Sequence, residues 1–315
     1  MVSVIVPLFN KAPYVLRALD SIARQTYTDF EVIVVDDGST DGGEALVAAF
    51  DDPRVRLVKQ SNAGPGAARN RGIAAARSTL LAFLDADDEW QPTFLARSLA
   101  LLDAHPQAAA ISSAAVRDPP GCSTVEGWRA RGLRDGEQRL QSTAPLAFAR
   151  DFLEFMTWPC ACIMRTEVAR RFGGYYEHHS TYGEDSYLML KILLAYPVVV
   201  NLEPLAVYHV DASGLNRARK ALRGTEAFLQ NPSQIYDVCP SELRPLLDQM
   251  LAAQARKTAC VLTYWGAWRE GRALIRRFPC ASPWRLPYFL PALIAVNPLG
   301  AAASALWRGR TRNSP

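Results

Sequence analysis

Short apolar runs alternate with segments of helical periodicity over the first hundred residues. The apolar, β-branched runs predict strands at 2–7, 30–35, 55–58 and 80–85. Val15, Leu19 and Ile22 recur at the spacing of one helix face, and residues 64–76 read as a glycine-opened, alanine-rich helix. Continuously apolar strands that alternate with helices are typical of a mostly parallel sheet covered on both faces. The pattern therefore predicts an α/β fold.

The next hundred residues continue the alternation with one interruption. Helices are expected at 93–104 and 184–196, and strands at 108–116, 159–165 and 198–202. Residues 117–150 lose the rhythm and carry adjacent prolines and several glycines, so we expect a loop-rich insertion there. Upstream, Asp41 and Glu44 have the spacing of a capping box for a helix at 44–50.

The chain beyond residue 214 is predicted to be helical, and its end is unusual. Residues 286–307 contain no charged side chain, and tryptophans stand near arginines at both ends of this segment. Several prolines and Gly300 interrupt it, which disfavours a full membrane span. Two interpretations stay open: peripheral contact with a membrane surface through residues 284–312, or short helices packed on the rest of the chain.

Composition narrows the class of protein. The 315 residues are 49% hydrophobic and 21% charged, as in a soluble globular protein. A net charge of only +4 argues against a dedicated nucleic-acid binder. Six cysteines include one C-x-C, Cys160 and Cys162, but no second pair for zinc, which favours free thiols in a reducing cytoplasm. The start of the chain lacks the pattern of a secretory signal, so we expect a cytoplasmic location.

Three acidic clusters fall at the ends of predicted elements. The pair Asp36–Asp37 ends the second strand, residues 85–88 follow the fourth, and the pair Glu184–Asp185 opens a helix. Ligands of parallel sheets gather at the carboxyl ends of the strands, so the first two clusters are expected to face one cleft. Adjacent carboxylates at the end of a buried strand are costly to desolvate, and this pair therefore needs partners.

The spacing within these clusters suggests particular chemistry. Asp85 and Asp87, one residue apart in a turn, can approach a hard cation together, and oxygen ligands favour Mg²⁺ or Mn²⁺, which bind a diphosphate. The same spacing is common in ordinary surface turns. Asp185 stands where the helix dipole favours any acid, but near a metal site it can act as a general base on an alcohol. Arg69, on the glycine-opened helix, suits a phosphate.

Taken together, these clusters resemble the family 2 inverting glycosyltransferases of the GT-A fold. The resemblance rests on residues 2–43, 62–92 and 173–193, which include "VVDDGSTDGG", "FLDADDEWQP" and "STYGEDSYLMLKIL". It covers most of residues 1–200. It implies a Rossmann-like GT-A domain over 1–214 and a C-terminal helical region over 215–315. Within the GT-A domain, residues 1–116 would form the nucleotide-sugar-binding half and residues 117–214 the acceptor half.

The resemblance also implies how a nucleotide-sugar donor is held. Pro7 and Asn10 match the loop that closes over the nucleotide. Asp37 matches the residue that contacts the base of a UDP-type donor, and Asp36 lies beside the ribose. Arg69 matches a position near the diphosphate. The donor contacts also include Asp85 and Ala86.

For the chemistry, the resemblance implies a divalent metal and one base. Asp85 and Asp87 look like the pair that holds Mn²⁺ or Mg²⁺ with the donor diphosphate. Asp185 looks like the base that deprotonates an acceptor hydroxyl, so that direct displacement at the anomeric carbon inverts the configuration of a hexosyl-type sugar. Further candidates are Asp88, Glu184 and His209. The acceptor implied is a glycan or glycolipid of a bacterial cell surface.

One departure and two alternatives accompany this interpretation. Many relatives carry a Y-R-x-H-type segment whose histidine completes the metal site, whereas this chain reads Tyr208-His209-Val210-Asp211. The pair His178–His179 offers a further, less specific metal ligand. One alternative function is a catalytically silent nucleotide-sugar-binding subunit. Another, a sugar-phosphate nucleotidyltransferase, lacks its glycine-rich loop after the first strand.

Overall fold

A computed structural model describes residues 1–177, 183–212, 224–280, 283–297 and 300. The chain divides into two compact units. Residues 1–140 and 150–219 form the first, and residues 141–149 and 220–315 form the second. The pair His178–His179 lies outside the described residues.

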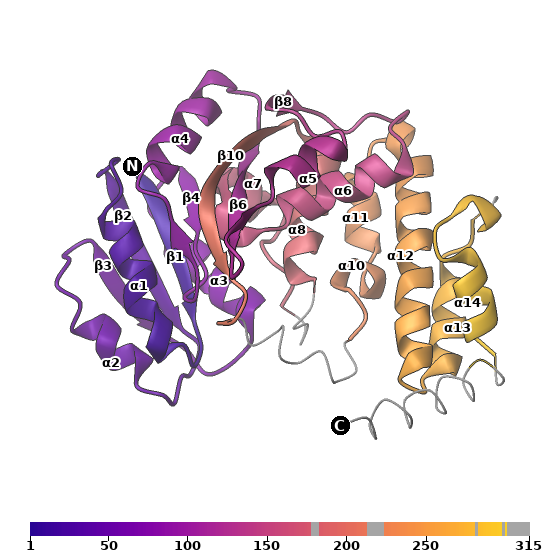
Figure 1. Cartoon of the computed structure of the whole chain (residues 1–315), viewed down its shortest axis with the longest axis horizontal. Coiled ribbons are helices and arrows are strands. Elements are labelled where there is room, and N and C mark those ends of the chain that lie inside the picture. Colours follow the sequence, from indigo (N-terminus) through magenta and orange to yellow (C-terminus); the bar gives the residue numbers. More distant parts are fainter. Residues whose placement is uncertain (178–182, 213–223, 281–282, 298–299, 301–315) are drawn as a thin grey trace. The chain divides into compact units, whose positions relative to one another are not determined.

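The first unit begins with the predicted parallel sheet (Figure 1). Its strands are β1 (Val2–Leu8), β2 (Phe30–Asp36), β3 (Val55–Lys59) and β4 (Leu80–Phe83), in the order β3-β2-β1-β4 and all parallel. They are joined by α1 (Ala12–Ala23), α2 (Gly43–Ala48) and α3 (Pro65–Ala75). The strands and connecting helices expected over the first eighty-five residues are thus confirmed, with β4 ending before Asp85.

Helices cover both faces of this sheet, as predicted. Along β1, side chains alternate between faces: Val4 and Val6 share a buried cluster with Val15 and Leu19 of α1. Ile5 points the other way, toward Gly72 of α3, where an added Cβ would lie 2.4 Å from its Cγ2. Gly72 therefore allows α3 to approach the strand closely.

The sheet continues with strands of both directions. β9 (Cys162–Arg165) runs antiparallel between β4 and β6 (Ala110–Asp118), and β10 (Val198–His209) is parallel to β6. The two-residue strand β5 (Glu89–Trp90) pairs antiparallel with β10. The first unit also contains the helices α4 (Phe94–Ala104), α7 (Thr166–Arg171) and α8 (Glu184–Ala195). The expected strand at 159–165 is shorter, because a 3₁₀ turn occupies Pro159–Ala161.

Two sequence expectations were wrong in detail. Residues 117–150 contain more regular structure than a loop: β7 (Cys122–Ser123), α5 (Val125–Ala130), β8 (Gly136–Gln138) and the start of α6 (Leu146–Met156).

The capping box predicted at Asp41 and Glu44 does not form. Gly42 caps α2 with a φ of 84° and no side-chain bond, while Asp41 accepts hydrogen bonds from the backbone N–H of Ala12 (2.8 Å) and Gly43 (3.0 Å). Asp41 thus joins α1 to the start of α2.

The second unit is helical over its described residues. Beyond residue 219, its elements are α10 (Ala227–Gln230), α11 (Ser233–Val238), a 3₁₀ turn at Ser241–Leu243, α12 (Arg244–Tyr264), α13 (Trp268–Arg277), a 3₁₀ turn at Pro283–Arg285 and α14 (Phe289–Ala295). The helices α13 and α14 pack along α12. None of the helices in the described part of the chain combines the length and the apolar character needed to cross a membrane.

Candidate active site

A pocket of about 720 Å³ opens at the carboxyl ends of the parallel strands of the first unit. The loops that follow β1, β2, β3 and β4 form its walls, together with the starts of α3 and α8. Its lining includes Pro7, Asn10, Lys11, Tyr14, Asp37, Asn62, Gly64, Arg69, Asp85, Ala86, Asp87, Glu184 and Tyr208. This is the edge where parallel sheets bind ligands, and most of the candidate residues meet there.

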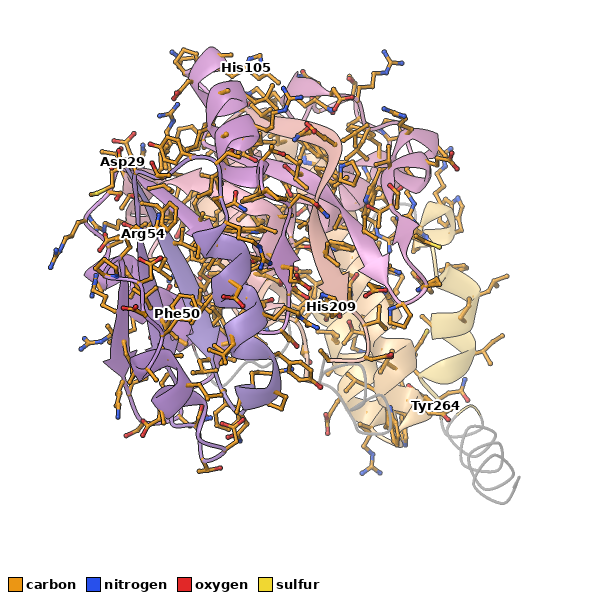
Figure 2. The ribbon with its side chains drawn as sticks, turned by 60° about the vertical axis from the view of Figure 1, so that its left-hand side comes forward. Asp29, Phe50, Arg54, His105, His209 and Tyr264 are labelled. Atoms are coloured by element: carbon orange, nitrogen blue, oxygen red, sulfur yellow. The ribbon has the colours of Figure 1, made fainter. Side chains whose placement is uncertain are left out.

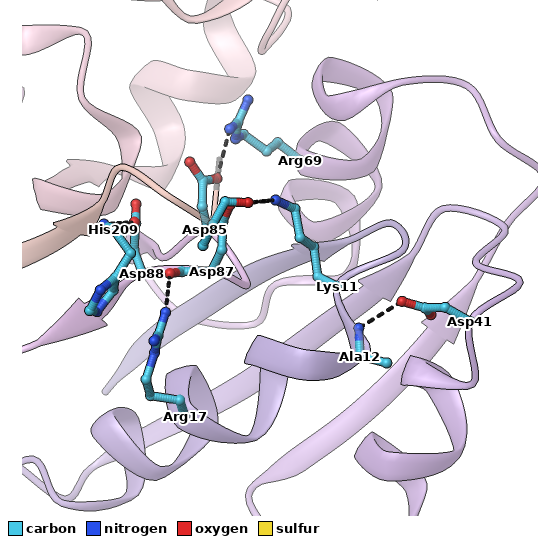
Figure 3. A network of polar contacts seen from close by, with 10 residues as sticks. Lys11, Ala12, Arg17, Asp41, Arg69, Asp85, Asp87, Asp88 and His209 are labelled. Atoms are coloured by element: carbon cyan, nitrogen blue, oxygen red, sulfur yellow. Dashed lines mark hydrogen bonds and ion pairs between the residues drawn. The ribbon is translucent and has the colours of Figure 1, made fainter. Parts of the chain in front are cut away.

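The acidic turn after β4 presents two carboxylates to this pocket, each paired with a cation (Figure 3). The backbone N–H of Asp88 donates to the carbonyl of Asp85 (3.0 Å), which closes the turn. Asp85 Oδ1 lies 2.8 Å from Arg69 Nη2, and Asp87 Oδ2 lies 2.5 Å from Lys11 Nζ. Burial and the neighbouring Asp85 raise the pKa of Asp87, while Lys11 opposes that rise. The turn is therefore a place where positive charge is strongly favoured.

The donor atoms of this turn suit a divalent cation of the Mg²⁺ type. Asp85 and Asp87 contribute carboxylate oxygens from one wall of the pocket. Among the described residues, no three His, Cys, Asp or Glu side chains converge as a metal cage. Mg²⁺ and Mn²⁺ commonly take one or two carboxylates and complete their shell with phosphate and water. The residues present fit that kind of site.

Arg69 connects the acidic turn to the start of α8. Its guanidinium is buried, with Nη1 2.9 Å from Glu184 Oε1 and Nη2 2.8 Å from Asp85 Oδ1. The ring centroid of Tyr175 lies 5.2 Å from the guanidinium carbon. Because a guanidinium fork holds two acceptors in fixed directions, Arg69 sets the distance between the two acidic clusters.

At the start of α8 the two acids have different surroundings. Glu184 lines the pocket, whereas Asp185 is not among the lining residues. The Oδ1 of Asp185 accepts a hydrogen bond from the backbone N–H of Ser186 (2.6 Å). Burial and the adjacent Glu184 raise the pKa of Asp185 to about 7, against the opposing charge of Arg69. A carboxyl with such a pKa can accept a proton near neutral pH.

The two adjacent aspartates after β2 are separated by their partners. Asp36 Oδ1 accepts the backbone N–H of Ser39 (3.0 Å), and Asp36 does not line the pocket. Asp37 does line it, and its buried carboxylate accepts hydrogen bonds from Gln60 Nε2 (2.8 Å) and the backbone N–H groups of Ala63 and Gly64 (both 2.9 Å). Three donors offset the desolvation of that carboxylate, and the bonds fix the loop that leads into α3.

The loop after β1 is held by Asn10. Its backbone has a φ of 50°, and its side-chain Oδ1 accepts the backbone N–H of Thr40 (2.9 Å). This bond ties the loops after β1 and β2 together beside the pocket. Pro7 and Ala86 also line it.

Two further candidates lie beside the pocket and not in its lining. His209 lies at the end of β10 (Figure 2). Its ring has Nε2 2.7 Å from Glu89 Oε1 and Nδ1 3.4 Å from Asp118 Oδ2. Asp88 is buried and accepts the backbone N–H of His209 (3.1 Å). The ring nitrogens of His209 thus face other carboxylates, and Asp88 joins β10 to the acidic turn.

Sequence reasoning did not identify Lys11 as part of the site. Its ammonium group bridges Asp87 and the carbonyl oxygen of Ala212, the latter at 2.6 Å. The sequence places Lys11 next to Asn10, in the loop after β1. A lysine in such a loop is most often solvated, so its position alone does not predict a role in the site.

The sequence is similar to a known family of proteins and to several of its members. The family model described as "Glycosyl transferase family 2" matches residues 3–173. The succinoglycan biosynthesis protein ExoO of Rhizobium meliloti is 33% identical over 243 residues, which cover 73% of this chain and 68% of that protein. The uncharacterized glycosyltransferase EpsJ of Bacillus subtilis is 46% identical over 90 residues, covering 28% of this chain and only 26% of that relative's length.

Solved structures show the same fold. S. aureus TarS 1–349 in complex with UDP-GlcNAc superimposes with a TM-score of 0.72 at 20% identity, covering 98% of this chain and 91% of that one. The mannosyltransferase PcManGT of Pyrobaculum calidifontis, in complex with GDP-Man and Mn²⁺, gives a TM-score of 0.50 at 22% identity, covering 98% and 79%. The architecture is therefore that of GT-A glycosyltransferases. Because the family model spans more than half of the chain, this protein is a glycosyltransferase and belongs to glycosyl transferase family 2.

Proposed function

We propose that this protein transfers a hexosyl-type sugar from a nucleotide-diphospho-sugar, of the UDP type, to an acceptor hydroxyl with inversion. One observation carries the proposal: Arg69 brings the acidic turn at Asp85 and the α8 start at Glu184 together at the pocket. We assign catalysis to residues 1–214, with the donor bound by residues 1–116 and the acceptor by residues 117–214.

The pocket walls suit the parts of such a donor. The Asn10 loop and Asp37 flank the place proposed for the nucleoside. Described residues fill three of the roughly four acceptor directions of the Asp37 carboxylate, and we assign the fourth to the base of the donor. Lys11 and Arg69 supply positive charge for the diphosphate. Asp85 and Asp87 would hold Mn²⁺ or Mg²⁺, which when bound stabilises the negative charge of the leaving diphosphate.

The proposed displacement needs a single base. The acceptor oxygen attacks the anomeric carbon, its proton passes to Asp185, and the bond to the diphosphate breaks with its electron pair on the leaving nucleoside diphosphate. Because the attack comes from the face opposite the leaving group, the configuration inverts, and no carboxylate nucleophile is required. The raised pKa of Asp185 equips it to receive that proton near neutral pH.

The relatives support the donor and the setting that we propose. UDP-GlcNAc is bound by TarS, and GDP-Man with Mn²⁺ by PcManGT, as the descriptions of those structures state. ExoO is named for succinoglycan biosynthesis. We accordingly propose a role in bacterial cell-surface polysaccharide or glycolipid synthesis, with donor use on the cytoplasmic side.

The test is nucleotide release from a panel of UDP- and GDP-sugars with Mn²⁺ or Mg²⁺, with and without EDTA. We expect release from a UDP-sugar that EDTA abolishes and that Asp87→Ala removes. A catalytically silent binding subunit would bind UDP by calorimetry without releasing it from any sugar. That outcome, or release at an equal rate in EDTA, would overturn the proposal.

A further inference from the structure

The outer side of α14 in the second unit exposes large apolar side chains. Leu290, Leu293 and Ile294 are 63%, 59% and 64% exposed, and they follow the i, i+3, i+4 spacing of one helix face. Just before the helix, Trp284 is 65% exposed. On the opposite side, Ala292 is buried. The helix is thus amphipathic, with a cluster of four large apolar side chains left in water.

This part of the chain is also strongly basic. Residues 251–315 contain ten arginines and lysines and a single acid, Glu270. The exposed arginines of α13 include Arg272, Arg276 and Arg277, and Arg285 follows Trp284 directly. Such a charge balance is far from that of the whole chain, whose net charge is +4. The apolar cluster therefore sits in an electropositive segment.

The exposed apolar side chains and the basic charge together indicate the partner that this face of the second unit binds. We propose that Trp284, Leu290, Leu293 and Ile294 insert into the interfacial region of a membrane rich in anionic phospholipid, with the arginines near its headgroups. Apolar insertion and basic charge each bind membranes weakly, and the two together give stable, reversible attachment. Tryptophan is favoured at the boundary between headgroups and acyl chains. The inference is independent of the donor pocket.

A second copy of this chain fits the surface less well. Face-to-face contact of two such surfaces would bring the arginines of two copies together, and residues 251–315 contain a single acid, Glu270, to offset them. Like charges across an interface disfavour association. An anionic bilayer supplies the missing negative charge. It also accepts the uncharged residues 286–297 without burying unpaired charges.

Flotation of the full-length protein with vesicles tests the proposal. Vesicles of phosphatidylcholine with about one third phosphatidylglycerol are compared with phosphatidylcholine alone. We expect binding to the anionic vesicles only, and loss of binding in Leu290→Ser/Leu293→Ser. Replacing Arg276 and Arg277 with Gln should weaken binding roughly 30-fold, which corresponds to about 1 kcal/mol for each basic residue near the surface. The control Leu16→Ser, an exposed apolar residue of α1, should bind normally.

The contrary outcomes are clear. No binding of the folded wild-type protein to either vesicle overturns the proposal, as does undiminished binding of the Leu290/Leu293 variant. Equal binding to neutral and anionic vesicles would show that the arginines do not contribute to membrane binding, and would overturn the proposed preference for anionic phospholipid. A dimer that sediments in solution and is lost in the same variant would assign the surface to a second copy. None of these results depends on nucleotide release, so they leave the proposed activity untouched.

Discussion

Lys11 Nζ lies 2.5 Å from Asp87 Oδ2, so a side chain of the protein already neutralises the carboxylate proposed to hold a metal. Both side chains are largely buried, at 21% and 14% exposure. A charged hydrogen bond in such surroundings is typically worth about 1.5–3 kcal/mol. Lys11 therefore either competes with the metal for Asp87 or shifts toward the donor phosphates when the metal binds.

Lys11→Met separates these roles. Loss of a competing cation should raise the affinity of the donor-free protein for Mn²⁺ by roughly tenfold or more, from the magnitude of such a bond. Titration followed by electron paramagnetic resonance of free Mn²⁺ measures this without any turnover. Lys59→Met, which removes an exposed lysine paired with Glu44, is the matched control and should change nothing. An unchanged or weaker Mn²⁺ affinity in Lys11→Met would show that Lys11 does not compete with the metal.

Asp185→Asn tests the proposed base. The variant should retain UDP binding and lose sugar transfer by a factor of about 10²–10⁴, the usual worth of general-base catalysis. Because the pKa of Asp185 is raised to about 7, the wild-type rate should rise with pH through about 7 as the carboxyl ionises. The residual rate of the variant should lack this rise. Transfer at the native rate would contradict the assignment.

The same raised pKa bears on stability. Between the ordinary value near 3.8 and about 7, the folded protein holds a proton on Asp185 that the unfolded chain releases. Stability from this group is therefore present at low pH and declines as pH rises through that window. Urea unfolding at pH 5 and pH 8 should show a smaller decline in Asp185→Asn than in the wild type. An identical decline in both would show that Asp185 titrates normally.

Arg69→Ala should destabilise the first unit. The substitution leaves the buried Glu184 and the half-buried Asp85 without their shared partner, and removing one member of a buried network typically costs about 3–5 kcal/mol. Arg97→Ala is the control, because its pair with Glu203 is 64% and 43% exposed. Exposed pairs contribute less than about 1 kcal/mol. Equal shifts of the urea midpoint in both variants would contradict a structural role for Arg69.

Gly72→Ala tests the close packing of α3 on β1. An added methyl group would lie 2.4 Å from Ile5 Cγ2, so the helix must shift, at a cost of about 1–3 kcal/mol. Gly127→Ala in α5 has open space around the new Cβ and should be neutral or slightly stabilising. Adding Ile5→Ala to Gly72→Ala should remove the clash, though it also loses buried surface. Thermal unfolding that ranks Gly127→Ala as the worse substitution would refute this packing.

The parallel half of the fold could be predicted because its strands are apolar throughout and separated by helices. Residues 2–7, 30–35, 55–58 and 80–85 needed no long-range information. The direction of β9 was not predictable, because a short apolar run says nothing about the strand beside it. The expected capping box does not form because Gly42, and not Asp41, is the N-cap residue of α2. Gly42 adopts the left-handed conformation, which glycine reaches without steric cost, and it has no side chain to cap the helix.

The candidate site was predictable where topology alone positions a residue. Asp37, Asp85 and Asp87 follow strands that end at the same edge of the sheet, and the pocket brings them together. The bridge from Lys11 to Asp87 depends on a loop conformation, and the arrangement of His209 with Glu89 depends on the pairing of β5 with β10. Neither is encoded in local spacing.

The most direct test of the central claim is proton NMR of the protein incubated with a UDP-α-sugar and no acceptor, so that water takes the place of the acceptor hydroxyl and free sugar is the expected product. The anomeric signal reports cleavage at the reacting carbon and its stereochemistry in one measurement. We predict that the β-anomer appears first, that EDTA prevents its release, and that Asp185→Asn abolishes it. First appearance of the α-anomer, or equal release with EDTA present, would contradict a metal-dependent inverting transfer at this pocket.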